Sequence, residues 1–129
     1  MVESGKRSRG LLGLTVLLGL GGVIAGAIGA HPPEGFLEDE EMRNGWRSAV
    51  YFLLFHVLVV LACADLAAAS LGRFRLPVQL FIAGILLFSG SIFLLALGGP
   101  SWLGPVTPVG GLILMLGWAA LFFQVVRAG

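Results

Sequence analysis

The stretch Leu11–His31, LLGLTVLLGLGGVIAGAIGAH, predicts the architecture of the chain. It contains no Asp, Glu, Lys or Arg, and about 20 apolar residues at ~1.5 Å each match a bilayer core of ~30 Å. Five small residues follow one another at spacings of four, three, four and three, namely Thr15, Gly19, Gly22, Gly26 and Gly29. On a helix they form one stripe, which lets a neighbouring backbone come close in lipid. We therefore expect this helix to be the one against which the others pack.

The composition indicates a membrane protein with one domain. Of the 129 residues, 57% are hydrophobic and 12% are charged, against about 45–50% and 25% in soluble proteins. The apolar residues fall in long blocks without a linker or repeat between them. A net charge of +1 excludes the basic face that nucleic-acid binding requires. The single cysteine, Cys63, forms no internal disulfide.

The apolar blocks predict an all-α membrane protein with four transmembrane helices in an antiparallel bundle. The expected spans are residues 10–30, 48–70, 76–97 and 107–126, with an outer loop at 31–47. Pro32 and Pro33 end the first helix, and Thr107-Pro108 predicts an N-cap followed by proline at the first helical position. For the outer loop we favour a solvated acidic segment with Trp46 as an interfacial anchor over an acidic binding patch or a surface helix.

The distribution of basic residues predicts the orientation. One side of the four-span arrangement holds Lys6, Arg7, Arg9, Arg73, Arg75 and Arg127, whereas the other holds only Arg43 and Arg47. Positive residues stay cytoplasmic, so we expect both termini in the cytoplasm and the chain in the bacterial inner membrane. The basic N-terminus followed by an apolar run also suits a secretory signal peptide. We favour an uncleaved helix because the run exceeds the roughly 7–15 residues of a signal core.

Two ionisable residues fall inside a span, His56 and Asp65, and such residues are functional candidates by default. His56 shares a helical stripe with small residues and is expected to face the interior. It would either handle protons or a ligand, or bond as a neutral imidazole to a neighbouring helix, for example at Ser89 or Ser91; we favour the second role. Asp65 lies about 180° round the helix, which excludes a direct relay, and pairing with basic groups at the inner surface is its favoured role.

The remaining polar residues form no catalytic or metal motif. His31, His56 and Glu34 offer metal-ligand atoms, but their spacing matches no compact site, and we expect no metal or cofactor. The chain lacks a phosphate loop, a nucleophile elbow and paired carboxylates, so we expect no enzyme. The candidate functional polar residues are His31, Tyr51, His56, Asp65, Ser89 and Ser91. The candidate helix-packing glycines are Gly19, Gly22, Gly26, Gly29, Gly90, Gly110, Gly111 and Gly117.

Several short motifs carry a resemblance to a known family. They are GAIGAH (26–31), YFLLFHVL (51–58), FSGSIF (88–93), TPVGG (107–111) and GW (117–118). In this order they resemble the YgdD/YwdK-type small inner-membrane proteins, a domain-of-unknown-function family with small mitochondrial membrane relatives. The chain departs from that pattern at Ile28, where the family usually has phenylalanine, and at Phe93, where it has tyrosine. The double proline and the acidic run also differ. The resemblance implies a four-helix inner-membrane protein and brings no established activity.

Two classes of function fit these features. The first is a non-enzymatic structural or accessory subunit, in contact with the lipid bilayer and with a membrane-protein partner or further copies of itself, because glycine-lined surfaces outnumber polar groups. The alternative is a small-solute or proton transporter or channel acting as an oligomer. It rests on His56 facing inward, His31 at the outer mouth and the fourth helix N-terminus near Thr107.

Overall fold

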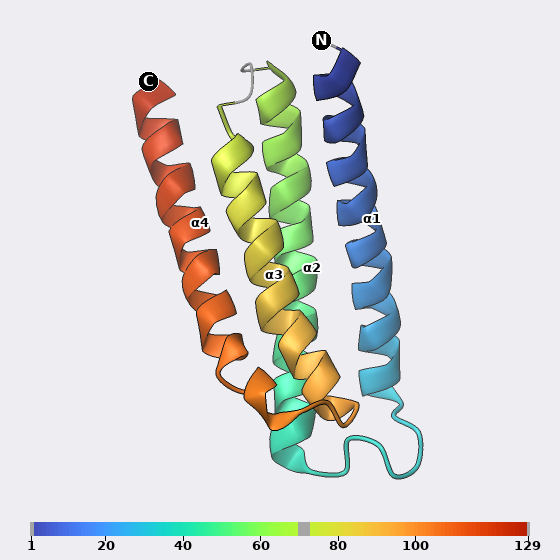
Figure 1. Cartoon of the computed structure of the whole chain (residues 1–129). Helices are drawn as coiled ribbons and strands as arrows, with labels where there is room; N and C mark the ends of the chain where they lie inside the picture. Colours follow the sequence, from blue (N-terminus) through green and yellow to red (C-terminus); the bar gives the residue numbers. More distant parts are fainter. Residues whose placement is uncertain (1, 70–72, 129) are drawn as a thin grey trace.

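The chain folds into four antiparallel helices joined by short connections (Figure 1). The computed structural model describes the backbone of residues 2–69 and 73–128 and the side chains of residues 6–7, 9–64 and 73–127. The elements are α1 (Val2–Ala30), α2 (Glu40–Ala69), α3 (Arg75–Ala96), the 3-10 helix η1 (Ser101–Leu103) and α4 (Val106–Ala128). The described residues contain no strand.

All four helices are long and apolar enough to cross a membrane. The apolar segments are Arg9–Ala30, Glu40–Ala64, Arg75–Ala96 and Ser101–Arg127. Large apolar side chains point outward on every helix, among them Leu17 on α1, Leu58 on α2 and Met115 on α4. A soluble protein rarely exposes so much contiguous apolar surface, whereas a bilayer requires it. The predicted all-α fold with four membrane-spanning helices is confirmed.

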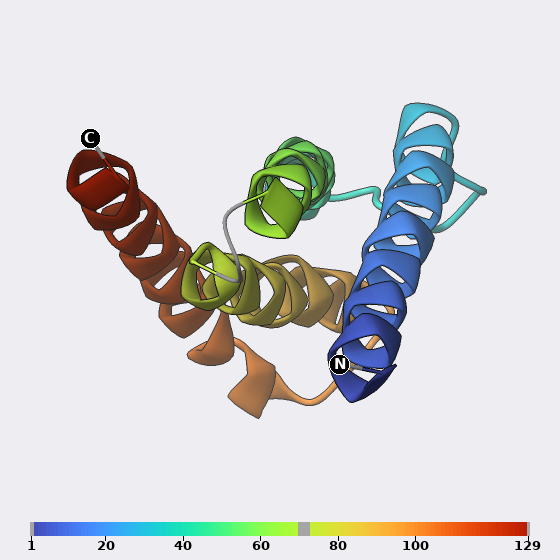
Figure 2. The ribbon, with the colours of Figure 1, turned by 90° about the horizontal axis from the view of Figure 1, so that it is seen from above.

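The buried core lies between α2 and α3 rather than around α1. Phe81 of α3 is fully buried among Leu53, Val57 and Val60 of α2 and Leu114 of α4. Seen along the helices, α3 lies between α2 and α4, and α1 stands at the edge beside α2 (Figure 2). The expectation that the other helices pack around α1 is therefore wrong. A glycine stripe allows one close neighbour, and here that neighbour is α2.

The glycine stripe of α1 contacts a regular row of side chains on α2. A Cβ atom added at Gly22 would lie 2.7 Å from Leu54 Cδ2, and one at Gly29 would lie 2.7 Å from Trp46 Cδ1. At Gly19 and Gly26 the added Cβ would be 3.3 Å from Val57 Cγ1 and 3.4 Å from Val50 Cγ1. Thr15 completes the stripe, and its hydroxyl donates to the Leu11 carbonyl at 2.8 Å within α1.

The connection between α1 and α2 is shorter than predicted, because α2 begins at Glu40 and not near residue 48. The backbone N–H of Glu41 donates to Asp39 Oδ1 at 2.8 Å, so Asp39 caps the helix. Glu40 and Glu41 occupy the first turn, where carboxylates interact favourably with the helix dipole. The acidic run that suggested a loop at 31–47 is thus partly a helix start, and the loop covers residues 31–39.

This loop is folded against the helices and is not simply solvated. Leu37 is 1% exposed and has a φ of 57°, and its carbonyl accepts bonds from Arg43 Nε at 3.1 Å and Nη2 at 3.0 Å. Trp46 is 5% exposed, and its indole Nε1 donates to the Ala25 carbonyl of α1 at 2.8 Å. Its ring also packs on Phe93 of α3. The expected interfacial anchor is therefore a buried residue that joins α1, α2 and α3.

The contact between α3 and α4 rests on glycines of both helices. A Cβ at Gly110 would clash with the backbone nitrogen of Phe88, and one at Gly117 would lie 2.8 Å from Phe81 Cδ1. Gly84 of α3 has the same role, because its Cβ would lie 2.6 Å from Leu114 Cδ2. Gly111 is less tight, with 3.7 Å from its added Cβ to Phe88 Cδ2.

Gly90 has no packing partner within this chain, and the expected N-cap at Thr107 is wrong. A Cβ at Gly90 would meet nothing within 4 Å, since this residue points away from the neighbouring helices. The helix α4 begins at Val106, so Thr107 is not its N-cap. Thr107 instead bonds Ser91 of α3, with 2.6 Å between the hydroxyl oxygens.

Candidate functional site

His56 lies near the middle of α2, where α2 faces both α3 and α4. The side chain is 3% exposed. Its Nδ1 lies 2.7 Å from the Phe52 carbonyl oxygen, and its Nε2 lies 3.1 Å from the indole Nε1 of Trp118 on α4. A carbonyl only accepts and an indole N–H only donates, so Nδ1 carries the proton and Nε2 accepts. His56 is thus a neutral imidazole with both nitrogens engaged.

Aromatic rings surround this imidazole. The Phe52 ring stacks on the imidazole with 5.9 Å between the ring centroids. The ring of Phe81 on α3 lies with its centroid 5.5 Å from that of the imidazole. Trp118 packs edge-on at 6.1 Å while donating its hydrogen bond. The predicted bond from His56 to a neighbouring helix exists, but its partner is Trp118 and not Ser89 or Ser91.

An apolar groove of about 530 Å³ opens beside His56 between α2 and α4. Its lining includes Tyr51, Phe52, Phe55, Phe88 and Met115. Tyr51 is 64% exposed. The groove is lined mainly by apolar side chains, and the imidazole of His56 in its lining already has both nitrogens hydrogen-bonded.

Ser89 and Ser91 connect helices. The Ser89 hydroxyl donates to the Ala49 carbonyl of α2 at 2.7 Å. Ser91 lies 2.6 Å from the Thr107 hydroxyl of α4 and also donates to the Phe88 carbonyl at 3.0 Å. Side-chain bonds of this kind hold transmembrane helices together. Among the described residues, both serines bond only carbonyl or hydroxyl groups, none of which is a base that could activate them.

The other two candidates lie apart from His56. His31 is exposed just after α1, where its backbone N–H donates to the Ala27 carbonyl at 3.1 Å. Asp65 belongs to α2, but its side chain lies outside the described residues, so its predicted pairing stays a prediction. Among the described residues no group of three or more His, Cys, Asp or Glu side chains gathers as a metal site would require.

Three residues that hold the helices together were not among the candidates predicted from the sequence. Trp118 was recognised as part of a motif but not as the partner of His56, Trp46 was placed at the interface, and Gly84 was overlooked. The signal was weak in each case. A tryptophan in an apolar run suits many environments, and a lone glycine in a helix shows nothing of what lies opposite it.

The chain matches a family profile described as "Protein of unknown function (DUF423)" over residues 25–111. It is 36% identical to a UPF0382 membrane protein of Schizosaccharomyces pombe over 113 residues, which cover 84% of this chain and 94% of the relative. It is 34% identical to the UPF0382 membrane protein YwdK of Bacillus subtilis over 104 residues, or 79% of this chain and 84% of that one. A UPF0382 membrane protein of Haemophilus influenzae is 35% identical over 114 residues, covering 87% and 90%.

No solved structure shows significant similarity to the chain. The relatives are membrane proteins by name, in agreement with the four apolar helices, and the resemblance to YwdK found in the sequence motifs is confirmed. The matched region runs from the last turns of α1 to the start of α4 and includes His56, Ser89 and Gly110. On this coverage and identity, the chain belongs to the DUF423 family of membrane proteins of unknown function.

Proposed function

We propose that this protein is a non-enzymatic accessory or scaffold subunit that packs against other transmembrane helices. The observation that carries the proposal is a second row of glycines on α1. A Cβ added at Gly10, Gly13 or Gly21 would meet nothing within 4 Å. At about 100° per residue, Gly21 lies within about 20° of Gly10 and Gly13 within about 60°. These three residues, the outward glycine row, lie on the side of α1 opposite the stripe that packs on α2.

In lipid, small residues on a helix face favour association because they let another helix approach closely, and on this face they alternate with exposed large side chains such as Leu17. The position of α1 at the edge of the arrangement leaves room for that helix (Figure 2). Glycine also destabilises a helix relative to alanine. Three glycines that contacted only lipid would therefore lower the stability of α1 without any gain from packing.

The buried polar groups support this proposal over the transport alternative. Among the described residues every buried side-chain nitrogen and oxygen has a hydrogen-bond partner. The imidazole of His56 is bonded on both sides, and Ser89 and Ser91 are bonded between helices. A solute or proton path needs polar groups with free donors or acceptors along it.

We also propose that the protein lies in an inner membrane with both termini in the cytoplasm. The two ends of the chain lie at the same end of the helices (Figure 1). The basic residues Arg9, Arg73, Arg75 and Arg127 belong to that end, whereas only Arg43 and Arg47 lie at the other. The positive-inside rule then favours the cytoplasm for the termini.

The test is recovery of tagged protein from membranes in a mild detergent, followed by native mass determination. We compare wild type with Gly21→Leu, which fills the outward glycine row. Ala119→Leu is the matched control, because it places the same side chain at an exposed position of α4. Gly22→Leu is unsuitable, because Gly22 faces Leu54 and its substitution would disturb the chain's own packing.

The proposal predicts a defined complex that survives Ala119→Leu and dissociates in Gly21→Leu. The mass of the complex identifies a further copy or another protein. A strictly monomeric wild type without a partner would contradict the proposal. In that case solute flux in proteoliposomes, with and without His56→Ala, becomes the test of the transport alternative.

A further inference from the structure

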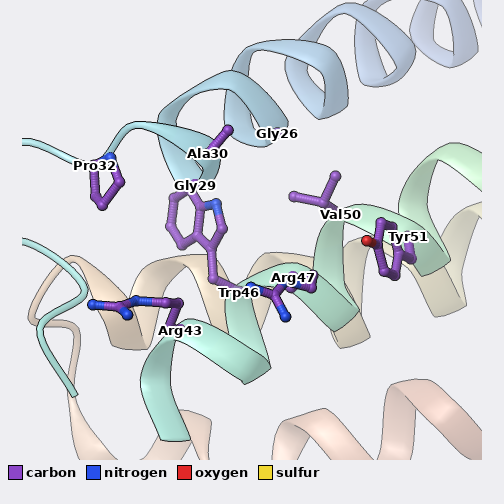
Figure 3. A pocket seen from close by; sticks show the side chains of 9 residues that line it. All are labelled: Gly26, Gly29, Ala30, Pro32, Arg43, Trp46, Arg47, Val50 and Tyr51. Atoms are coloured by element: carbon purple, nitrogen blue, oxygen red, sulfur yellow. The ribbon is translucent and has the colours of Figure 1, made fainter. Parts of the chain in front are cut away.

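A second cavity, of about 560 Å³, lies between the end of α1 and the start of α2. Figure 3 shows Trp46 crossing from α2 towards Gly29, with Arg43, Arg47 and Tyr51 along the α2 wall and Pro32 beyond the end of α1. This site is distinct from the groove beside His56, although Tyr51 borders both. We refer to it as the arginine pocket.

One face of α2 supplies the polar side of the arginine pocket. Arg43, Arg47 and Tyr51 are spaced by four residues, so they align along the helix. The guanidinium of Arg43 is held in place by two bonds to the Leu37 carbonyl, from Nε at 3.1 Å and Nη2 at 3.0 Å. A guanidinium has five N–H donors, so Arg43 keeps further donors for a ligand. Among the described residues, none that lines the pocket carries a carboxylate.

The pocket changes from polar to apolar along the membrane normal. The two arginines lie in the first turns of α2, beside the folded loop, whereas Gly26 and Val50 lie deeper against the apolar parts of α1 and α2. At a membrane surface the surroundings change in the same direction, from water to hydrocarbon. A ligand that fits has an anionic group at the surface and an apolar part beneath it.

We propose that the arginine pocket binds the phosphodiester headgroup of a membrane glycerophospholipid. Arginine suits this ligand because its planar fork of donors bonds phosphate oxygens in pairs. In other membrane proteins, basic pockets between transmembrane helices on the cytoplasmic side bind lipid headgroups, and the two arginines offer the same chemistry at this end of the helices. A soluble phosphate ester shares the charge but not the apolar part, so the lipid is the occupant that uses the whole pocket. The inference does not depend on the proposed scaffold function.

The experiment is native mass spectrometry of detergent-purified protein titrated with dioleoylphosphatidylglycerol. Two further ligands separate the sources of the phosphate: dioleoylglycerol, which has the same chains without phosphate, and glycerol 3-phosphate, which has the phosphate without chains. The variants are Arg47→Gln, which removes one cation of the pocket, and Ala30→Phe, which obstructs it with both arginines kept. Arg75→Gln is the control, because it removes the same charge at the opposite end of the helices.

The wild type and Arg75→Gln are expected to bind the phospholipid equally. Binding weakens about fivefold in Arg47→Gln, as expected for one cation near a phosphate, and also in Ala30→Phe, while dioleoylglycerol and glycerol 3-phosphate bind at least tenfold more weakly. Two results would overturn the assignment of the phospholipid to this pocket. One is equal affinity of wild type and Arg47→Gln for the phospholipid, and the other is a loss of affinity in Arg75→Gln as large as that in Arg47→Gln. Glycerol 3-phosphate binding as tightly as the lipid would overturn the assignment to a lipid. The oligomeric state of Arg47→Gln, read in the same spectra, separates this result from the scaffold proposal.

Discussion

The pair of substitutions Gly110→Ala and Gly90→Ala tests the packing of α3 on α4. Both add one methyl group to a glycine inside a helix. At Gly110 the new Cβ would clash with the backbone nitrogen of Phe88 and lie 2.8 Å from the Leu87 carbonyl carbon. At Gly90 it would meet nothing within 4 Å. Backbone atoms cannot rotate away as a side chain can, so Gly110→Ala forces the two helices apart.

The expected magnitude follows from two opposing terms. Overpacking of a close contact destabilises by about 1–3 kcal/mol. Alanine favours a helix over glycine by up to about 1 kcal/mol, and this term acts in both variants. Their difference therefore isolates the contact, with Gly110→Ala about 1–3 kcal/mol less stable than Gly90→Ala. Gly90→Ala itself is expected to be as stable as wild type or slightly more stable.

The assay is unfolding of purified protein in mixed micelles with increasing sodium dodecyl sulfate, followed by circular dichroism and tryptophan fluorescence. The free energy of unfolding is compared among wild type and both variants in the same detergent. Equal stability of Gly110→Ala and Gly90→Ala would refute the close approach of α3 and α4. Destabilisation by Gly90→Ala would show that this residue has a neighbour.

Three further substitutions test the hydrogen bonds between helices, each by the same unfolding assay. Trp118→Phe removes the donor to His56 Nε2 and is expected to cost about 0.5–1.5 kcal/mol; a double variant with His56→Phe that shows no coupling would contradict the bond. Ser89→Ala removes one donor to the Ala49 carbonyl and is expected to cost about 0.6 kcal/mol, the average for such bonds in membranes, and a loss above about 2 kcal/mol would indicate a different role. Trp46→Ala empties the contact among α1, α2 and α3 and is expected to cost about 3–5 kcal/mol, with a loss below 1 kcal/mol favouring the interfacial position.

The membrane fold was predictable because hydropathy and length depend on one helix at a time. The third span was expected at 76–97, and α3 covers Arg75–Ala96. The start of α2 was harder to predict from the sequence, since the acidic run fits a solvated loop and a helix start equally well. Its capping by Asp39 decided between them.

The arrangement of the helices was harder to predict because it depends on which faces meet. The glycine spacing on α1 identified a packing face but gave no number of neighbours, and α3 turned out to be central. The bond between His56 and Trp118 joins residues 62 positions apart. It depends on how α4 is rotated about its own axis. A helix with few polar residues does not specify in its sequence which face is turned toward α2. For the same reason Gly90 and Gly110 look alike in sequence and differ in structure.

Photocrosslinking in intact membranes shows whether another protein lies against the outward glycine row of α1. A photoreactive amino acid replaces Gly21 in one variant and Ala119 on α4 in another, and tagged products are resolved by size after illumination. A discrete protein adduct is expected from position 21 and lipid adducts alone from position 119. Lipid adducts alone from both positions would contradict the claim that α1 packs against a further helix.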